Sequence, residues 1–338
     1  MKKLISLICV LAMVLALAAC GSSAPAAATE APAASTEAPA EDVSADKTFV
    51  VGICQLVQHP ALDAATQGFK DALTEALGDK VTFQEQNASG DSATCSLICN
   101  QFVSDEVDLI MANATASIQA AASATNTIPI LGTSITDYGV ALGVDNWTGV
   151  SGTNISGTSD LAPLDGQAAM IQELFPDAKT IGLLYCSGEP NSIFQADSME
   201  ALLTDMGYSV ERYTFADSND VSSVTANACS NADVLYIPTD NTAASCTEAI
   251  NNVALNAGIP IVAGEEGIAA GCGVATLSIS YYDLGRATGE MAAEILTEGA
   301  DVSTMEVRFA PAFTKEYNAD ICEALNITVP EDYVAIAK

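Results

Sequence analysis

The strongest constraint on the fold is the alternation of short apolar runs with longer amphipathic segments, which starts at Lys47. The apolar runs are nearly continuous and rich in Val, Ile and Leu, as in strands that are buried on both faces of a parallel sheet. The expected strands are TFVVGIC, VTFQEQ, VDLIMAN, IPILGT, TIGLLYC, YSVERYTF, ADVLYIPT, IPIVAG and GVATLSIS. The pattern therefore predicts a doubly wound α/β fold.

The segments between these runs repeat apolar residues at helical spacing, which predicts helices covering both faces of the sheets. The expected helices cover residues 61–77, 93–103, 117–125, 165–175, 192–206, 221–231, 243–257, 284–297 and 315–325.

Two blocks of the chain resemble each other. Residues 107–134 and 232–266 each contain an Asp, an apolar strand, a Thr-rich turn, an Ala-rich helix and an Ile-Pro-Ile segment. Such a repeat predicts two lobes of similar design. In open parallel sheets, ligands bind beyond the carboxyl ends of the strands. We therefore expect the turns that follow equivalent strands to line one cleft between the lobes.

The N-terminus has the features of an export signal. A basic start and an apolar segment from Leu4 to Ala16 precede LAAC, which ends at Cys20. LAAC followed by Gly-Ser-Ser resembles a bacterial lipobox, which implies a signal peptide over residues 1–19, cleavage before Cys20 and a lipid on its sulfur. The alternative is an ordinary export signal with an incidental cysteine.

Residues 20–46 are rich in Ala, Pro, Ser, Thr and Glu and contain no large apolar cluster. This composition predicts a disordered tether that holds the folded part away from a membrane. No later segment contains enough consecutive apolar residues to span a bilayer.

The charge balance of 11 Lys and Arg against 43 Asp and Glu gives a formal net charge of −32. Such acidity repels phosphate backbones and argues against nucleic-acid binding. The sequence also lacks GxSxG, P-loop and GxGxxG motifs, and its single histidine has no partner for a metal pair. We therefore expect neither an enzyme nor a bound metal or cofactor. The pairing of eight cysteines after Cys20 stays open: 54, 95, 99, 186, 229, 246, 272 and 322.

Polar residues follow the equivalent strands of the two blocks and suit a small zwitterion. Hydroxyls and helix N-termini bind a carboxylate, and acidic side chains pair with an ammonium. Thr115, Thr133 and Ser134 are the candidates for the carboxylate. Asp240, Asn241 and Glu265 are the candidates for the ammonium and the polar edge of the ligand. The alternative for each hydroxyl and for Asp240 is a helix N-cap.

The segment QLVQHPALD contains His59, the only histidine of the chain. Pro60 favours an extended His59 and suits the first turn of a helix. The segment therefore predicts a strand, a stiff turn and a helix start that present Gln58 and His59 to the cleft. The alternative is a histidine that only caps or packs.

The lipobox, the tether and the two lobes resemble a substrate-binding lipoprotein of an ABC importer. The segments QLVQHPALDAATQGFKDAL, NISGTSDLAP, KTIGLLYCSGEPNS, YIPTDNT, IPIVAGEEG and SISYYDLGRATGEMAAEIL are similar to the tryptophan/tyrosine-binding (TrpX-like) family. This resemblance implies a type I periplasmic-binding fold, with three crossovers between the lobes. Lobe 1 would take residues 47–153 and about 281–312, and lobe 2 would take 154–280 and about 313–338.

The resemblance also implies a function: capture of an aromatic amino acid and delivery to a membrane permease with its ATPase. Asn191 and Ser192 would cap a second-lobe helix at the cleft mouth, and a monomer is expected. Tyr185, Tyr236, Tyr281, Tyr282 and Trp147 are the aromatic residues that could stack on the ligand. The alternatives are a ligand sensor for a membrane receptor, a tethered enzyme, or binding of another metabolite such as a nucleoside or a sugar.

Overall fold

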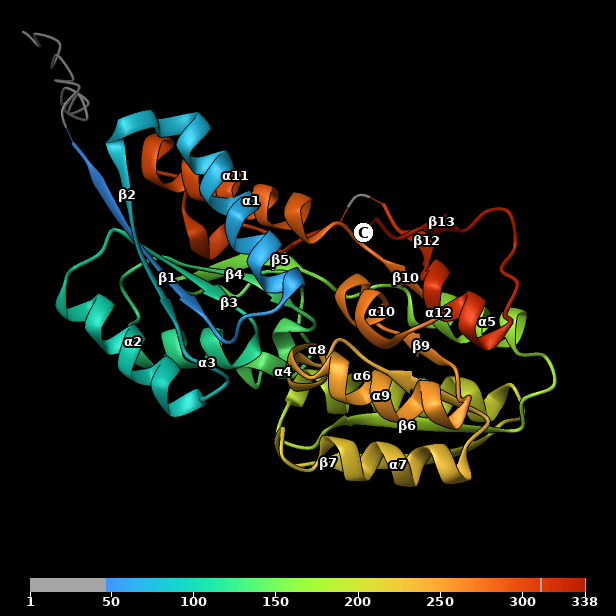
Figure 1. Ribbon diagram of the computed structural model, residues 1–338. Coiled ribbons are helices and arrows are strands. Elements are labelled where there is room, and N and C mark those ends of the chain that lie inside the picture. Colours follow the sequence, from blue (N-terminus) through green and yellow to red (C-terminus); the bar gives the residue numbers. More distant parts are fainter. Residues whose placement is uncertain (1–46, 311, 338) are drawn as a thin grey trace, which may run out of the picture. The chain divides into compact units, whose positions relative to one another are not determined.

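The computed structural model describes residues 47–310 and 312–337, which form two α/β lobes (Figure 1). The expected signal peptide, the lipidation site at Cys20 and the tether lie outside the described residues. Within the described part of the chain, no helix is both long and apolar enough to cross a membrane.

The first sheet is parallel throughout, with the strand order β11-β5-β4-β3-β1-β2. Its strands are β1 (Phe49–Gln55), β2 (Val81–Asn87), β3 (Leu109–Asn113), β4 (Ile130–Ile135), β5 (Ile155–Ser159) and β11 (Arg308–Phe309). Helices α1 (Pro60–Leu77) and α11 (Tyr281–Glu298) cover one face, while α2 (Ser92–Ser104) and α3 (Thr115–Ala124) cover the other. A short helix, α4 (Tyr138–Leu142), and two 3₁₀ turns, Gly78–Lys80 and Val302–Thr304, complete the lobe.

Helices α1 and α11 touch through glycines. A Cβ on Gly285 would collide with the carbonyl oxygen of Ala65, and one on Gly68 would collide with that of Tyr282. The backbones can approach so closely only because both positions lack a side chain. The contact fixes the N-terminal ends of the two helices beside each other, next to the turn that carries His59.

The second sheet has the order β13-β12-β10-β9-β8-β6-β7. Its strands are β6 (Thr180–Cys186), β7 (Ser209–Phe215), β8 (Val234–Ile237), β9 (Ile261–Ala263), β10 (Ala275–Ser278), β12 (Thr314–Tyr317) and β13 (Val334–Ala335). One face packs on α5 (Leu164–Leu174), α6 (Pro190–Asp205) and α12 (Ala319–Leu325). The other packs on α7 (Val221–Asn231), α8 (Asn241–Ser245), α9 (Thr247–Ala257) and α10 (Glu266–Cys272).

The chain passes between the sheets three times: after β5, after β10, and between β11 and β12. The α/β class and the two mainly parallel sheets predicted from the sequence are confirmed. The second sheet departs from the pattern at β12, which runs antiparallel to β10.

Two of the expected boundaries are wrong by four residues or more. Lobe 1 does not end at residue 153, because β5 pairs with β4 and continues the first sheet to Ser159. The helix expected over 315–325 begins only at Ala319, because Thr314–Tyr317 hydrogen-bonds to β10 as a strand. Backbone pairing thus overrides the helical spacing of the apolar residues in that segment.

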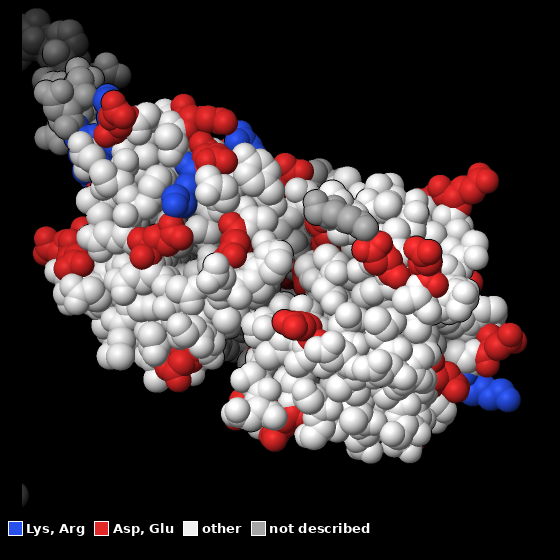
Figure 2. Space-filling view, viewed as in Figure 1, with Lys and Arg blue, Asp and Glu red and all other residues white. Residues whose placement is uncertain are grey.

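Acidic side chains are scattered over both lobes on the face drawn in Figure 2, where Lys and Arg are few. The described residues on this face gather no basic patch that could hold a phosphate backbone. The spread of charge agrees with the net charge of −32.

Candidate functional site

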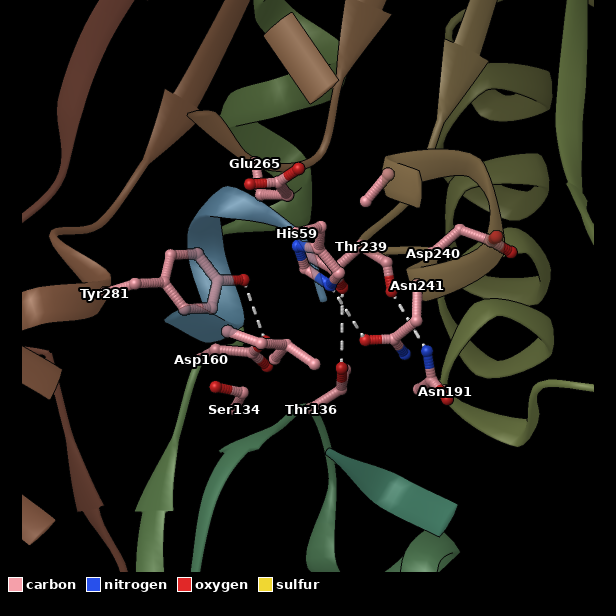
Figure 3. A pocket seen from close by; sticks show the side chains of 12 residues that line it. His59, Ser134, Thr136, Asp160, Asn191, Thr239, Asp240, Asn241, Glu265 and Tyr281 are labelled. Carbon is pink, nitrogen blue, oxygen red and sulfur yellow. Dashed lines mark hydrogen bonds between the residues drawn. The ribbon is translucent and has the colours of Figure 1, made fainter. Parts of the chain in front are cut away.

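A polar pocket lies between the two lobes, and most of its lining follows the carboxyl ends of strands (Figure 3). The rule for ligand sites in open parallel sheets therefore applies to both lobes. We name this cavity the inner pocket; its lining residues are His59, Leu62, Ser134, Thr136, Asp160, Asn191, Thr239, Asp240, Asn241, Ala244, Glu265 and Tyr281.

The structure brings six of the ten sequence-predicted ligand residues together in the inner pocket. They are His59, Ser134, Asn191, Asp240, Asn241 and Glu265.

The other four predicted residues lie elsewhere. Gln58 is exposed and lines a separate groove on the first lobe with Lys70 and Glu85. Thr115 and Thr133 are buried within the first lobe, where the Thr133 hydroxyl accepts a hydrogen bond from Thr158 at 3.3 Å. Ser192 is buried behind Asn191, which donates to its hydroxyl at 3.3 Å.

Asp240 and Glu265 serve as helix N-caps, the role that the sequence left open for Asp240. Asp240 accepts the backbone N–H of Ala243 at 2.7 Å and that of Cys186 at 2.6 Å. Glu265 accepts the N–H of Gly267 at 2.6 Å and that of Ile268 at 2.5 Å. Burial raises the pKa of Glu265 to about 7, and burial together with the nearby Glu189 carboxylate raises the pKa of Asp240. These carboxylates are thus already occupied by backbone donors.

Asp160 is an acidic side chain of the inner pocket that is not among the ten ligand residues predicted from the sequence. It follows β5, is buried, and its Oδ2 accepts a hydrogen bond from the Tyr281 hydroxyl at 2.9 Å. Its Oδ1 has no partner among the described residues. Burial raises the pKa of Asp160 to about 6, against the lowering effects of the Tyr281 hydrogen bond and of the Thr136 hydroxyl nearby. A buried carboxylate with one free oxygen is well suited to pair with a cation.

Three of the six buried side-chain atoms that lack a partner among the described residues belong to the lining of the inner pocket. They are His59 Nδ1, Ser134 Oγ and Asp160 Oδ1. Each unpaired polar atom costs about 1–3 kcal/mol. Ser134 also has a φ of 56°, a left-handed conformation that costs about 1–3 kcal/mol for a residue other than glycine. Costs of this kind are typical of sites shaped for a ligand.

Side chains of the two lobes meet across the inner pocket. His59 Nε2 lies 3.3 Å from Asn241 Oδ1, and the hydroxyls of Thr136 and Thr239 are 3.4 Å apart. Gln195 donates to both threonine hydroxyls. The enclosed cavity measures only about 10 Å³, room for a single water molecule. A larger ligand therefore requires these side chains or the lobes to move apart.

A larger cavity of about 370 Å³, the outer cleft, adjoins the inner pocket at Asn241, which lines both. The first lobe contributes Leu56, Val57, Ala116 and residues 89–92. The second lobe contributes Cys186, Ala216, Ser245 and residues 188–189, 217–218 and 241–242. The outer cleft thus offers apolar surface beside the polar inner pocket.

Of the five aromatic residues considered from the sequence, Tyr281 alone lines the inner pocket. Tyr185 and Tyr236 are buried in the second-lobe core, Trp147 stacks on Tyr138, and Tyr282 donates to Asp71 on the surface.

All eight cysteines of the described residues carry free thiols. The same residues contain no cluster of three or more His, Cys, Asp or Glu side chains that could hold a metal ion.

Comparisons with known proteins agree with this architecture. Residues 50–338 match the family model of the ABC transporter substrate binding protein. A tyrosine-binding protein from Clostridioides difficile strain R20291 is 38% identical over 280 residues, which cover 82% of this chain and 81% of that protein.

Two solved structures are similar over nearly their whole length. The ABC domain from Streptococcus pneumoniae in complex with L-Trp is 31% identical with a TM-score of 0.80, covering 84% of this chain and 97% of that one. The ligand-free, open structure of CD0873, a substrate-binding protein with adhesive properties from Clostridium difficile, is 38% identical with a TM-score of 0.66. It covers 86% of this chain and 99% of that one.

With two lobes, a polar pocket between them and a family match that spans nearly all of the described residues, this chain belongs to the ABC transporter substrate-binding protein family.

Proposed function

We propose that this chain is an extracytoplasmic, lipid-anchored solute-binding protein that captures an aromatic amino acid between its lobes and delivers it to an ABC permease. The observation that carries the ligand class is the free Oδ1 of buried Asp160 inside the inner pocket. A ligand with a positive charge would pair with this oxygen, and an amino acid carries one on its ammonium.

The polar groups of the inner pocket suit both ends of a zwitterion. The ammonium lies against Asp160, while the carboxylate takes hydrogen bonds from hydroxyls such as those of Ser134, Thr136 and Thr239, all in the lining. Ser134 Oγ makes no hydrogen bond among the described residues, so binding a carboxylate would not break one.

The aromatic side chain occupies the outer cleft. That cavity of about 370 Å³ lies within the usual size of small-molecule sites. The inner pocket measures about 10 Å³, so its side chains or the lobes must move apart before it admits the two charged ends of the ligand. Leu56, Val57, Ala116 and Ala216 supply apolar surface for the ring.

The relatives support this ligand class. The curated relative is a tyrosine-binding protein, and the pneumococcal domain is a complex with L-Trp. The open, ligand-free relative superposes less well than the L-Trp complex although its sequence is more similar. We infer that the lobes of this chain are arranged more as in the L-Trp complex, and that binding works by closure around the ligand.

Membrane attachment through Cys20 would keep the protein beside its permease. Two acyl chains on a diacylglyceryl cysteine give stable anchoring, because single chains bind membranes only marginally. Mass spectrometry of the N-terminal peptide of the mature protein should find acyl chains on Cys20, whereas a mature protein with an unmodified Cys20 would contradict the lipid anchor.

Mass spectrometry of small molecules released from the purified, heat-denatured protein tests the ligand class. We expect tyrosine, tryptophan or a close analogue, with a thermal shift when the same compound is added back. Release of a sugar or a nucleoside, with no stabilisation by any amino acid, would overturn the ligand class.

A further inference from the structure

His59 sits at the N-cap of α1 without capping it, since its side chain makes no hydrogen bond to the helix. His59 as a whole residue is 6% exposed. Nε2 faces Asn241 Oδ1 of the other lobe at 3.3 Å, and Nδ1, on the opposite side of the ring, has no partner among the described residues. The protonation state of this ring therefore decides whether Nδ1 donates or accepts in the inner pocket.

Glu189, the N-cap residue of α6, holds Asn241 in place (the two residues lie in the same lobe). Its carboxylate accepts the backbone N–H of Asn241 at 3.0 Å and the side-chain Nδ2 at 2.7 Å. It also accepts the N–H and the hydroxyl of Thr242, both at 2.8 Å, and Nδ2 of Asn191 at 3.2 Å. Five donors thus converge on one carboxylate.

This arrangement fixes the orientation of the Asn241 amide. Turning the amide over would place Oδ1 at the position now held by Nδ2, 2.7 Å from a carboxylate oxygen, where two acceptors repel each other. Oδ1 must therefore face His59, and an oxygen that only accepts requires Nε2 of His59 to carry the proton.

We propose that Glu189 is a positioning residue that acts through Asn241 to hold His59 as the Nε2–H tautomer, so that Nδ1 accepts a hydrogen bond from the amino group of the ligand. The identity of the ligand group rests on the proposed function, whereas the tautomer does not.

The surroundings of His59 agree with a neutral ring. Burial lowers the pKa of His59 and outweighs the Asn241 hydrogen bond and the charges of Glu189 and Asp63, which act in the opposite direction. A neutral ring offers Nδ1 as an acceptor, and Asp160 Oδ1 is a second acceptor in the lining of the same pocket. Two free acceptors match the several N–H donors of one ammonium better than they match a carboxylate.

The single histidine makes the tautomer directly measurable. In a chain labelled with ¹⁵N-histidine, only one imidazole contributes signals, and a protonated ring nitrogen is readily told from an unprotonated one. At pH 8, we expect Nε2 to be the protonated nitrogen and Nδ1 the unprotonated one. A protonated Nδ1 in the wild-type chain would overturn the proposal.

Two variants test the role of Glu189. Glu189→Gln can donate to Asn241 Oδ1 and let the amide turn over, so we expect the Nδ1–H tautomer to become populated and tyrosine affinity to fall about tenfold. Asn241→Ala removes the acceptor and should also mix the tautomers. Glu248→Gln, an exposed change on α9, is the matched control and should leave both readouts unchanged. A folded Glu189→Gln protein with a pure Nε2–H tautomer would contradict the positioning role, and the wild-type spectrum decides on the tautomer if this variant does not fold.

Ligand titration identifies the group that faces His59. We expect L-tyrosine to shift the Nδ1 resonance, and 3-(4-hydroxyphenyl)propionate, which lacks the amine, to leave it unchanged even at saturation. Tyrosine binding without any change at Nδ1 would overturn the contact and leave the proposed function intact. Failure of every amino acid to bind would instead overturn the proposed function, and the tautomer measurement would stand independently.

Discussion

Replacing Asp160 with Asn should weaken ligand binding and, at the same time, stabilise the ligand-free protein. Asn keeps an oxygen that can accept the Tyr281 hydroxyl, now 2.9 Å from the carboxylate, but it carries no charge. Removing one partner of a buried charge pair typically costs about 2–5 kcal/mol of binding energy. Affinity for tyrosine should therefore fall by roughly 30-fold to several thousand-fold.

The stability change follows from the same burial. The pKa of Asp160 rises from 3.8 to about 6 in the folded protein. At about 1.36 kcal/mol for each pH unit, the ionised carboxylate costs the fold about 3 kcal/mol at neutral pH. Because folding raises the pKa of this acid, ionised Asp160 destabilises the fold only at higher pH. The cost is absent below about pH 4, grows up to about pH 6 and is constant above. The Asp160→Asn substitution would remove this cost.

Calorimetric titration with L-tyrosine and urea unfolding, both at pH 7.5, measure the two effects. Asp177→Asn, an exposed change on the second lobe, is the matched control. An Asp160→Asn protein that binds tyrosine as well as the wild type would refute the role of Asp160. An Asp160→Asn protein that unfolds at a lower urea concentration than the wild type would refute the claim that the buried charge destabilises the fold.

Three further predictions concern the same site and its support. Tyr281→Phe removes the hydrogen bond that lowers the pKa of Asp160, so tyrosine binding at pH 7 should weaken about tenfold. Unchanged affinity would count against a role of the Tyr281–Asp160 hydrogen bond in binding. Tyrosine affinity should be about tenfold lower at pH 5 than at pH 7.5, because protonation of Asp160 below about pH 6 removes the negative charge. This slope should be clearly smaller in Asp160→Asn, where Glu265, whose pKa burial raises to about 7, still titrates in the same pocket. Gly285→Ala should force α11 away from Ala65 of α1 and lower the free energy of unfolding by about 1–3 kcal/mol, as measured by urea denaturation. Thr297→Ala, an exposed change on the same helix, should have little effect.

The fold was predictable because its signal is continuous along the chain. Strands such as Phe49–Gln55 and Leu109–Asn113 are buried on both faces, so each leaves an uninterrupted apolar run in the sequence. The lobe boundary was not predictable in the same way. The segments NWTGVSG and NISGTSD are similar, and only strand pairing shows that Ile155–Ser159 completes the first sheet.

The site was predictable as a set of turns, but not as a set of side chains. Gln58 and His59 are neighbours on one turn, and backbone direction alone places His59 inside and Gln58 outside. Asp240 and Glu265 reach the pocket, yet their oxygens are taken by backbone N–H groups of the helices they cap. Asp160 follows the strand whose lobe was misassigned, so its place opposite Tyr281 became visible only in three dimensions.

The central claim is that the space between the lobes binds an aromatic amino acid through its charged ends. The most direct test is calorimetric titration of the ligand-stripped protein with L-tyrosine, L-tryptophan, tyramine and 3-(4-hydroxyphenyl)propionate. We predict saturable binding of at least one of the two amino acids, and binding at least about tenfold weaker for the two analogues that lack one charged end. Equal binding of an amino acid and its deaminated analogue, or no binding of either amino acid, would contradict the claim.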